Sequence, residues 1–172
     1  MGPVSWLEAV RRGIRSRRFA RACEARLSGL PVPPAHDVVS LCHEVGRQRG
    51  RPIHLVALAL GADHPCGMWV ATDFADFIVH ESDTSKPHRD HIIAHELAHI
   101  LCEHTGTPQA LFPDLDPALV GAALHRAGYS HDDEREAEVV AGLILRLLSD
   151  VALRARRAEP TAVVARISNS LA

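Results

Sequence analysis

The segment from Ile92 to Leu101 constrains the fold most, because it places two histidines four residues apart in a mostly apolar run. It reads H-E-x-x-H at His95, Glu96 and His99. On a helix, residues four apart lie on the same face, about one turn from each other, so both imidazoles can reach one ion. Glu96 directly follows the first histidine and can hold a water beside that ion. This layout is typical of a zinc-dependent peptidase, in which the glutamate takes a proton from the attacking water.

The motif alone leaves an alternative open, because the chain contains 12 histidines. In that alternative the segment is an ordinary core helix whose two histidines bond to the backbone. A catalytic zinc centre takes three protein ligands and keeps one open position. The continuation H-E-x-x-H-x-x-G-x-x-H is excluded, because Cys102 stands at the glycine, Thr105 at the last histidine, and His104 comes one residue early. We therefore expect the third ligand to come from a second helix.

The acidic segment Asp132–Leu145 predicts that second helix, since its first turn is rich in carboxylates. An apolar stripe runs along it, formed by Val140, Leu143, Ile144 and Leu147. Glu134 and Glu138 fall on one face together with Ala137 and Ala141, and the two alanines would allow a close approach to the first helix. Glu134 is the predicted third ligand. Glu138 is the predicted partner that orients a ligating histidine by accepting its other N–H. Glu136 points to a different side of the helix and is expected to be a solvated charge. The alternative for Glu134 is the same: a solvated charge at a helix N-terminus.

Together the two segments resemble the ImmA/IrrE family of bacterial metallo-endopeptidases. The chain reads HELAH and later EREAEVVAGLIL, where members of that family typically read HELxH and E-x-x-A-[DN]-x-F-A-x-x-L-L. The resemblance runs from about Arg51 to Leu148. Three departures are visible: Glu138 stands where Asp or Asn is usual, Val140 stands where Phe is usual, and the proline that often follows the leucine pair is absent.

The resemblance implies that His95, His99 and Glu134 bind Zn²⁺ and that Glu96 is the general base. It also implies a protein substrate, a helix-turn-helix transcriptional repressor whose cleavage relieves repression. The residue that stabilises the oxyanion stays open between Tyr129 and three histidines of the same region, His88, His91 and His131.

The order of predicted elements is that of an α+β fold with a single zincin-like domain over residues 1–172. We expect N-terminal helices within residues 1–50, at Ser5–Ser28 and Asp37–Arg49. An antiparallel three-stranded meander is expected within 51–82, at Ile53–Leu60, Cys66–Thr72 and Phe74–Glu81, with the last strand at the edge beside the site. The metal-site helices are expected within 87–158, at Pro87–Glu103 and Asp132–Arg156. Shorter helices are possible at Pro117–Ala127 and Thr161–Ala172.

Composition predicts an intracellular protein. A chain of 172 residues that is 47% hydrophobic can bury a real core. Its four cysteines form no C-x-x-C pair, and no secretory signal or membrane span is recognisable, so we expect free thiols in the cytoplasm and no membrane partner. The net charge of -2 gives no reason to expect direct nucleic-acid binding. The first predicted helix is basic, and a solvated face is preferred over an acidic partner as its explanation.

Three function classes remain open at this point. The first is a zinc endopeptidase that cuts a repressor. The second is a non-proteolytic regulatory protein, for example a toxin/antitoxin-type partner, in which the zinc site is structural or vestigial. The third is a zinc hydrolase of a small molecule. The presence of all four catalytic-site residues favours the first class.

Overall fold

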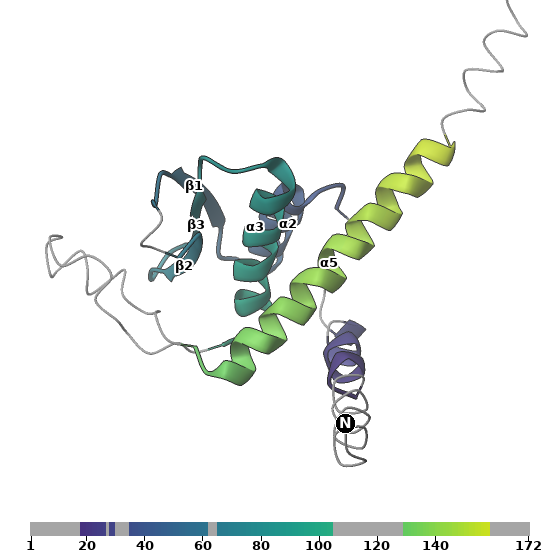
Figure 1. Cartoon of the computed structure of the whole chain (residues 1–172), viewed down its shortest axis with the longest axis horizontal. Coiled ribbons are helices and arrows are strands. Elements are labelled where there is room, and N and C mark those ends of the chain that lie inside the picture. The colour runs from purple at the N-terminus through teal and green to yellow at the C-terminus, as the bar shows by residue number, and fades with distance from the viewer. Residues whose placement is uncertain (1–17, 27, 30–34, 62–64, 105–128, 159–172) are drawn as a thin grey trace, which may run out of the picture.

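The protein combines helices with one small mixed sheet, as a computed structural model describes it for residues 18–26, 28–29, 35–61, 65–104 and 129–158 (Figure 1). The elements in chain order are α2 (Val38–Gln48), β1 (Ile53–Leu58), β2 (Gly67–Ala71), β3 (Asp76–Glu81), α3 (Lys86–Leu101) and α5 (His131–Ala158). Residues 18–26 are also helical. The predicted α+β class is therefore confirmed. The possible helices at Pro117–Ala127 and Thr161–Ala172 lie outside the described residues, as does most of Ser5–Ser28.

The sheet differs from the predicted antiparallel meander, because its strand order is β1-β3-β2. β3 pairs parallel with β1, from Ile53 opposite Asp76 onward, and antiparallel with β2, where Trp69 lies opposite Ile78. The expected edge strand Phe74–Glu81 is thus the central strand, and β1 and β2 are the two edge strands. The physical reason is burial: β3 has the most buried run of the three strands, and the central position gives it a neighbouring strand on each side.

A buried carboxylate fixes the start of β3. Asp76 is fully buried, and its Oδ2 accepts from Nη1 of Arg49 at 2.8 Å and lies 3.1 Å from Nε of Arg51. Its Oδ1 accepts from the indole N–H of Trp69 at 2.9 Å. Buried charges persist when they are paired and hydrogen-bonded in this way. The contact joins the end of α2, the loop before β1, and the edge strand β2.

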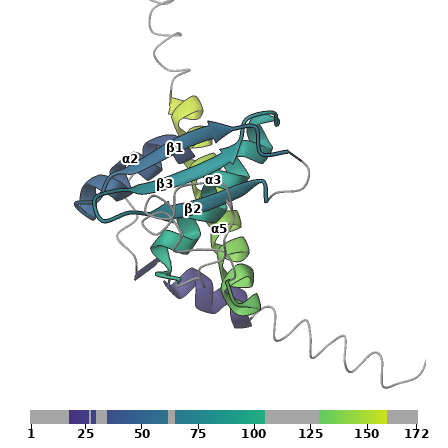
Figure 2. The same cartoon turned by 90° about the vertical axis from the view of Figure 1, so that its left-hand side faces the viewer.

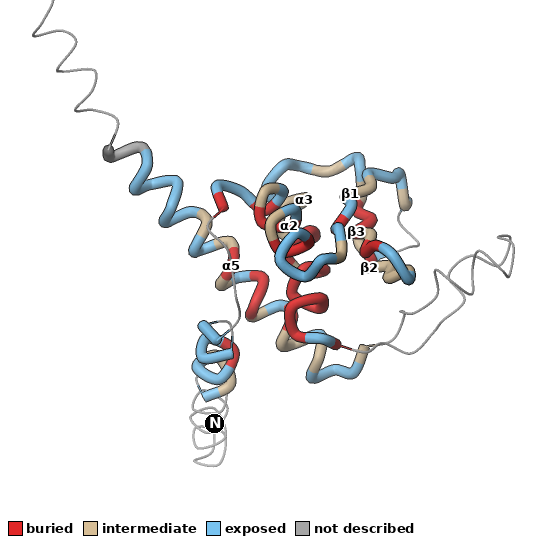
Figure 3. Tube along the Cα trace, turned by 180° about the vertical axis from the view of Figure 1, so that it is seen from behind, coloured by how far each residue is buried: buried red, intermediate tan, exposed pale blue. Residues whose placement is uncertain are grey.

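Helices α2 and α3 lie on one face of the sheet, and α5 crosses the outer side of α3 (Figures 1 and 2). Among the residues that the structure describes, no helix covers the opposite face of the sheet (Figure 2). Buried residues gather on α3 and on the surfaces that face it, whereas residues 149–155 of α5 are exposed (Figure 3). In the predicted apolar stripe, Val140 and Ile144 are buried but Leu147 is 51% exposed, so the stripe ends before the helix does.

No helix in the described ranges is both long enough and apolar enough to cross a membrane.

Candidate metal centre

Helix α3 carries the motif, and its residues from Ile92 to Leu101 are buried except for His95, which is partly exposed. Ser85 is the N-cap, and its side chain accepts a hydrogen bond from the backbone of His88. Pro87 lies in the first turn, where a missing N–H costs nothing. Ile93 and Leu97 are buried against the rest of the core. This packing leaves the histidines of the motif on the side that meets α5.

Helix α5 begins one turn before the predicted third ligand. The side chains of Ser130 and Asp133 cap it reciprocally, with the Ser130 backbone and hydroxyl donating to Oδ2 of Asp133 at 3.2 and 2.7 Å. The Asp133 backbone donates to the serine hydroxyl at 3.1 Å. The hydrogen bond from the Ser130 side chain holds the pKa of Asp133 below its usual value. The cap therefore fixes the turn from which Glu134 projects, and fully buried Ala137 and Ala141 let α5 approach α3 closely.

The three predicted ligands converge. Ligand atoms of His95, His99 and Glu134 all lie within 4.8 Å of one another. Nε2 of His95 lies 3.1 Å from Nε2 of His99 and 3.3 Å from Oε2 of Glu134. Nε2 of His99 lies 3.9 Å from Oε1 of Glu134. The structure thus brings together the ligand set inferred from sequence.

The donor set and its spacing fit a zinc ion. Two imidazole nitrogens and a carboxylate oxygen are the protein ligands of one well-known class of catalytic zinc site. With metal–ligand lengths of about 2.0–2.1 Å, two ligand atoms of a tetrahedral site lie about 3.3 Å apart. The His95–His99 and His95–Glu134 separations, 3.1 and 3.3 Å, match that value, whereas His99 lies 3.9 Å from the other oxygen of Glu134. The side chain of His99 is 1% exposed, that of His95 21% and that of Glu134 47%, so the set is buried at one end and open at the other.

Glu96 is buried beside the edge strand. It is 7% exposed, and a Cβ placed on Gly67 of β2 would lie 3.2 Å from its Oε1 and 2.3 Å from Cγ2 of Ile92. Glycine is therefore needed at the start of β2 for this close approach. The predicted base lies on the sheet side of α3, between the ligand-bearing face and the edge of the sheet.

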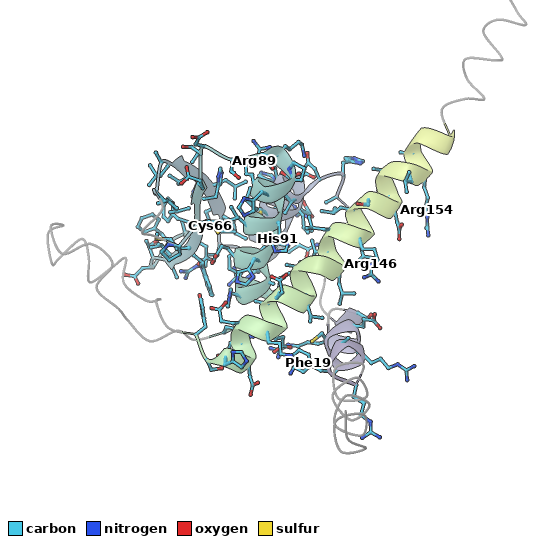
Figure 4. All side chains as sticks on the ribbon, viewed as in Figure 1. Phe19, Cys66, Arg89, His91, Arg146 and Arg154 are labelled. Carbon is cyan, nitrogen blue, oxygen red and sulfur yellow. The ribbon has the colours of Figure 1, made fainter. Side chains whose placement is uncertain are left out.

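Glu138 lies where the predicted orienting carboxylate should be. Its Oε2 is 3.6 Å from Nδ1 of His95, the nitrogen that faces away from the ligand set, and 3.2 Å from Nε2 of His91. His91 lies on the side of α3 that meets α5 (Figure 4). Because the Glu138 side chain is 60% exposed, its contact with His95 is weaker than a buried one would be.

The expectation that Glu136 is a solvated charge is wrong. Its side chain is 20% exposed, and Oε2 lies 3.3 Å from Nε2 of His104. Arg26 donates from Nη1 to Oε1 at 3.3 Å. Cys102, His104 and Glu136 form a second group whose potential ligand atoms lie within 4.8 Å of one another. Burial and the nearby Glu136 charge raise the pKa of the Cys102 thiol to about 11, so it is a neutral, buried group at pH 7 in the absence of a metal.

His104 is the residue of this region that the sequence analysis missed. It is 6% exposed, and its Nδ1 lies 3.0 Å from Nδ1 of His99. In the sequence, His104 stands one residue before the position at which the extended motif has its third histidine. Its spacing from His99 suits a turn that folds back after a helix, a geometry that helical periodicity does not predict.

The four residues that are candidates for stabilising the oxyanion differ in position. The Tyr129 ring stacks on His99, with centroids 3.7 Å apart, and its hydroxyl is buried. His91 contacts Glu138. His88 bonds to Thr84 in the first turn of α3, about 10 Å along the helix axis from His95. His131 is exposed at the start of α5. Tyr129 and His91 therefore lie at the site, and Tyr129 is the closer to the ligands.

Comparison of the chain with protein-family models, with curated proteins and with solved structures gives no match in any of the three.

Proposed function

We propose that the protein is a zinc-dependent endopeptidase of the ImmA/IrrE type. The observation that carries the proposal is the convergence of His95, His99 and Glu134 from two helices, with a buried glutamate one residue after the first histidine. A structural zinc site normally has four protein ligands, whereas three ligands and a partly exposed side are typical of a catalytic site. This is also the reason for preferring catalysis over a non-proteolytic role.

The chemistry divides between the ion and the protein. When bound, zinc would polarise a substrate carbonyl and lower the pKa of an adjacent water to about 7. Glu96 accepts a proton from the attacking water at its carboxylate and later delivers it to the leaving amine. Its place on α3 suits that role, because adjacent helix residues point about 100° apart and Glu96 cannot share the ligand position of His95.

Strand β2 is the element that would hold an extended peptide. Among the described residues it pairs only with β3, so its other side is one edge of the sheet. Gly67 of that strand lies against Glu96. A peptide that added to this edge through main-chain hydrogen bonds would pass the proposed base. This role replaces the one expected for Phe74–Glu81.

The proposed substrate is a helix-turn-helix transcriptional repressor, and the support for it is the family resemblance of the two motif segments. Cleavage would relieve repression. A cytoplasmic location belongs to the same proposal, because a bacterial transcriptional repressor is found in the cytoplasm.

The substitution Glu96→Gln tests the mechanism. It keeps the shape and a hydrogen bond to water but cannot accept a proton. We expect the variant to bind zinc like the unchanged protein and to cut a candidate repressor about 10²–10⁴-fold more slowly. The assay follows a discrete fragment by mass. Asp150→Asn, an exposed carboxylate on α5, is the matched control and should cut normally.

Two outcomes bear on the alternatives. Cleavage by Glu96→Gln at the normal rate would contradict the proposed mechanism. Binding of a repressor without any cut, by a zinc-loaded protein, would favour a regulatory interaction protein of the toxin/antitoxin type.

A further inference from the structure

We propose that His104 is a positioning residue for the metal centre: it holds the ring of His99 through a hydrogen-bonded chain that ends on Glu136. The inference rests on the proposed zinc site, since it assigns a role toward His99 as a ligand. It extends that site to two residues that the motif does not include.

The chain is continuous in the structure. Nδ1 of His104 lies 3.0 Å from Nδ1 of His99, and Nε2 of His104 lies 3.3 Å from Oε2 of Glu136. Oδ1 of Asp133 lies 3.7 Å from the same Nε2. His99 and His104 are both buried, so water does not compete freely for these nitrogens. Each ring nitrogen that does not face the ligand set therefore has a partner.

The donor and acceptor roles follow from one requirement. A histidine that offers the lone pair of Nε2 to a metal carries its proton on Nδ1. His99 must then donate from Nδ1, and the Nδ1 of His104 must accept. The proton of His104 is consequently on Nε2, where it is donated to the Glu136 carboxylate. In this arrangement each contact pairs one donor with one acceptor. The Glu136 carboxylate at the end of the chain makes His99 a more basic metal ligand.

The backbone places His104 for this contact. After the C-cap of α3 at Cys102, the backbone of Glu103 adopts a left-handed conformation with φ 56°. The N–H of Glu103 donates to the carbonyl of Ile100 at 3.3 Å, and that of His104 to the carbonyl of His99 at 3.1 Å. These two bonds define a Schellman turn, which usually has glycine at the left-handed position. A non-glycine residue held in this conformation is strained, and such strain is typical of a functional constraint.

The far end of the chain is anchored as well. Arg26 donates to both oxygens of Glu136 at 3.3 and 3.4 Å, and also to the backbone carbonyl of Cys102. The ring of Tyr129 stacks on a face of the His99 ring, with the two ring centroids 3.7 Å apart. The imidazole of His99 is therefore held both in its plane, by His104, and across its face, by Tyr129.

The same residues cannot readily serve as a second metal site at the same time. If Nε2 of His99 and Nε2 of His104 both bound metals as neutral imidazoles, two Nδ1–H groups would face each other at 3.0 Å. Two donors at that distance repel. The positioning role is consequently the one that is compatible with the ligand role of His99.

The test compares zinc affinity in His104→Ala, His104→Asn and the unchanged chain, by competition with a chelator. We expect His104→Ala to bind zinc about 10–100-fold more weakly, the usual size of such a loss. His104→Asn should recover part of it, because the amide oxygen can accept from His99. Glu136→Gln should weaken binding less than His104→Ala. His43→Ala, an exposed histidine on α2, is the control and should bind normally.

A second readout separates positioning from simple structural support. In the zinc-loaded protein, proton NMR should give a strongly downfield, slowly exchanging signal for the Nδ1 proton of His99. His104→Ala should lose it while keeping its helix content by circular dichroism. If His104→Ala unfolds, the comparison of His104→Asn and Glu136→Gln with the unchanged chain gives the same test.

The possible failures are distinguishable. An unchanged chain that binds no zinc overturns the proposed function and with it this inference. Tight binding by the unchanged chain and equally tight binding by His104→Ala overturns the positioning role alone. In the cobalt-substituted protein, a thiolate charge-transfer band that both Cys102→Ser and His104→Ala remove would make Cys102 and His104 ligands of a second ion, and would also overturn it.

Discussion

At the scale of single residues, the three glutamates of the first turns of α5 occupy three different environments. Glu134 faces the two motif histidines, Glu138 faces the outer nitrogen of His95, and Glu136 faces His104. Neighbouring positions on one helix therefore separate a ligand from the groups that orient ligands.

This separation predicts a graded effect on zinc binding. Glu134→Ala should abolish tight binding, because two protein ligands are seldom enough. Glu138→Ala should weaken binding at most about 10–100-fold, and its exposure places the effect at the lower end. Zinc titration with elemental analysis measures both. His99→Ala serves as the reference for complete loss, and full zinc in Glu134→Ala would mean that another residue is the third ligand.

Gly67 leads to a second residue-scale prediction. Gly67→Ala would place a Cβ 2.3 Å from buried Ile92, so β2 or α3 must shift and Glu96 with it. We expect lower stability, by about 1–3 kcal/mol as for other overpacked sites, and loss of cleavage with zinc binding retained. Denaturant unfolding and the fragment assay measure the two effects. Gly142→Ala on α5, where a Cβ meets nothing within 4 Å, is the control and should be tolerated.

At the scale of elements, helix ends follow local rules that can be tested one at a time. Asp37 caps α2: its Oδ1 accepts from the Ser40 backbone at 2.7 Å, and its own N–H donates to the Ser40 hydroxyl at 3.1 Å. Such a capping box stabilises a helix start by satisfying two otherwise unpaired donors.

The cap predicts a defined acid dependence. The backbone hydrogen bond from Ser40 lowers the pKa of Asp37 below its usual 3.8 in the folded state. A depressed folded pKa contributes stability that is present above pH 3.8 and is lost as the pH falls through the folded value. Asp37→Ala should cost about 1 kcal/mol at neutral pH, and Asp37→Asn much less. Asp37→Asn should also remove this part of the acid dependence in denaturant unfolding measured against pH; an unchanged profile would argue against the cap.

The bounds of the helices could be predicted from the sequence, but the pairing of the strands could not. The helices α2, α3 and α5 begin and end within two residues of their predicted bounds, because capping residues and apolar spacing are local signals. The pairing of strands is not local. The short turn before Asp76 correctly suggested a β2–β3 hairpin, but nothing near Ile53 indicates that β1 pairs with β3.

The candidate site divides in the same way. His95, Glu96 and His99 are fixed by one helical repeat, and Glu134 by a second helix with a capping signal. His104 needs a left-handed turn at a non-glycine residue, and Glu136 needs to be known as its partner. The first is a local turn with an unusual residue at its left-handed position, whereas the second depends on contacts between distant segments, one of them with Arg26, 110 positions away.

At the scale of the whole molecule, the proposed ion would join α3 to α5. Since zinc binds the folded state through residues of both helices, it should stabilise the fold by about 2.7 kcal/mol at a concentration of 100 times its Kd. Chelation should lower the unfolding midpoint and speed hydrogen exchange in the first turns of α5. Its exposed last turns, which carry Arg154 away from the body of the molecule, should not change (Figure 4). His99→Ala, as the control, should show no response to zinc.

The central place of β3 has a consequence for synthesis on the ribosome. In the order β1-β3-β2, neither outer strand neighbours the other, so the two strands made first cannot join in their native arrangement. The backbone donors and acceptors of β1 and β2 stay without their native strand partner until β3 is made. Exposed strand edges of this kind are where nascent chains aggregate. The sheet can close only once Glu81 has left the exit tunnel, and the next segment to emerge is α3. The sheet and the helix that bears the metal-binding motif thus become able to fold within one short stretch of translation.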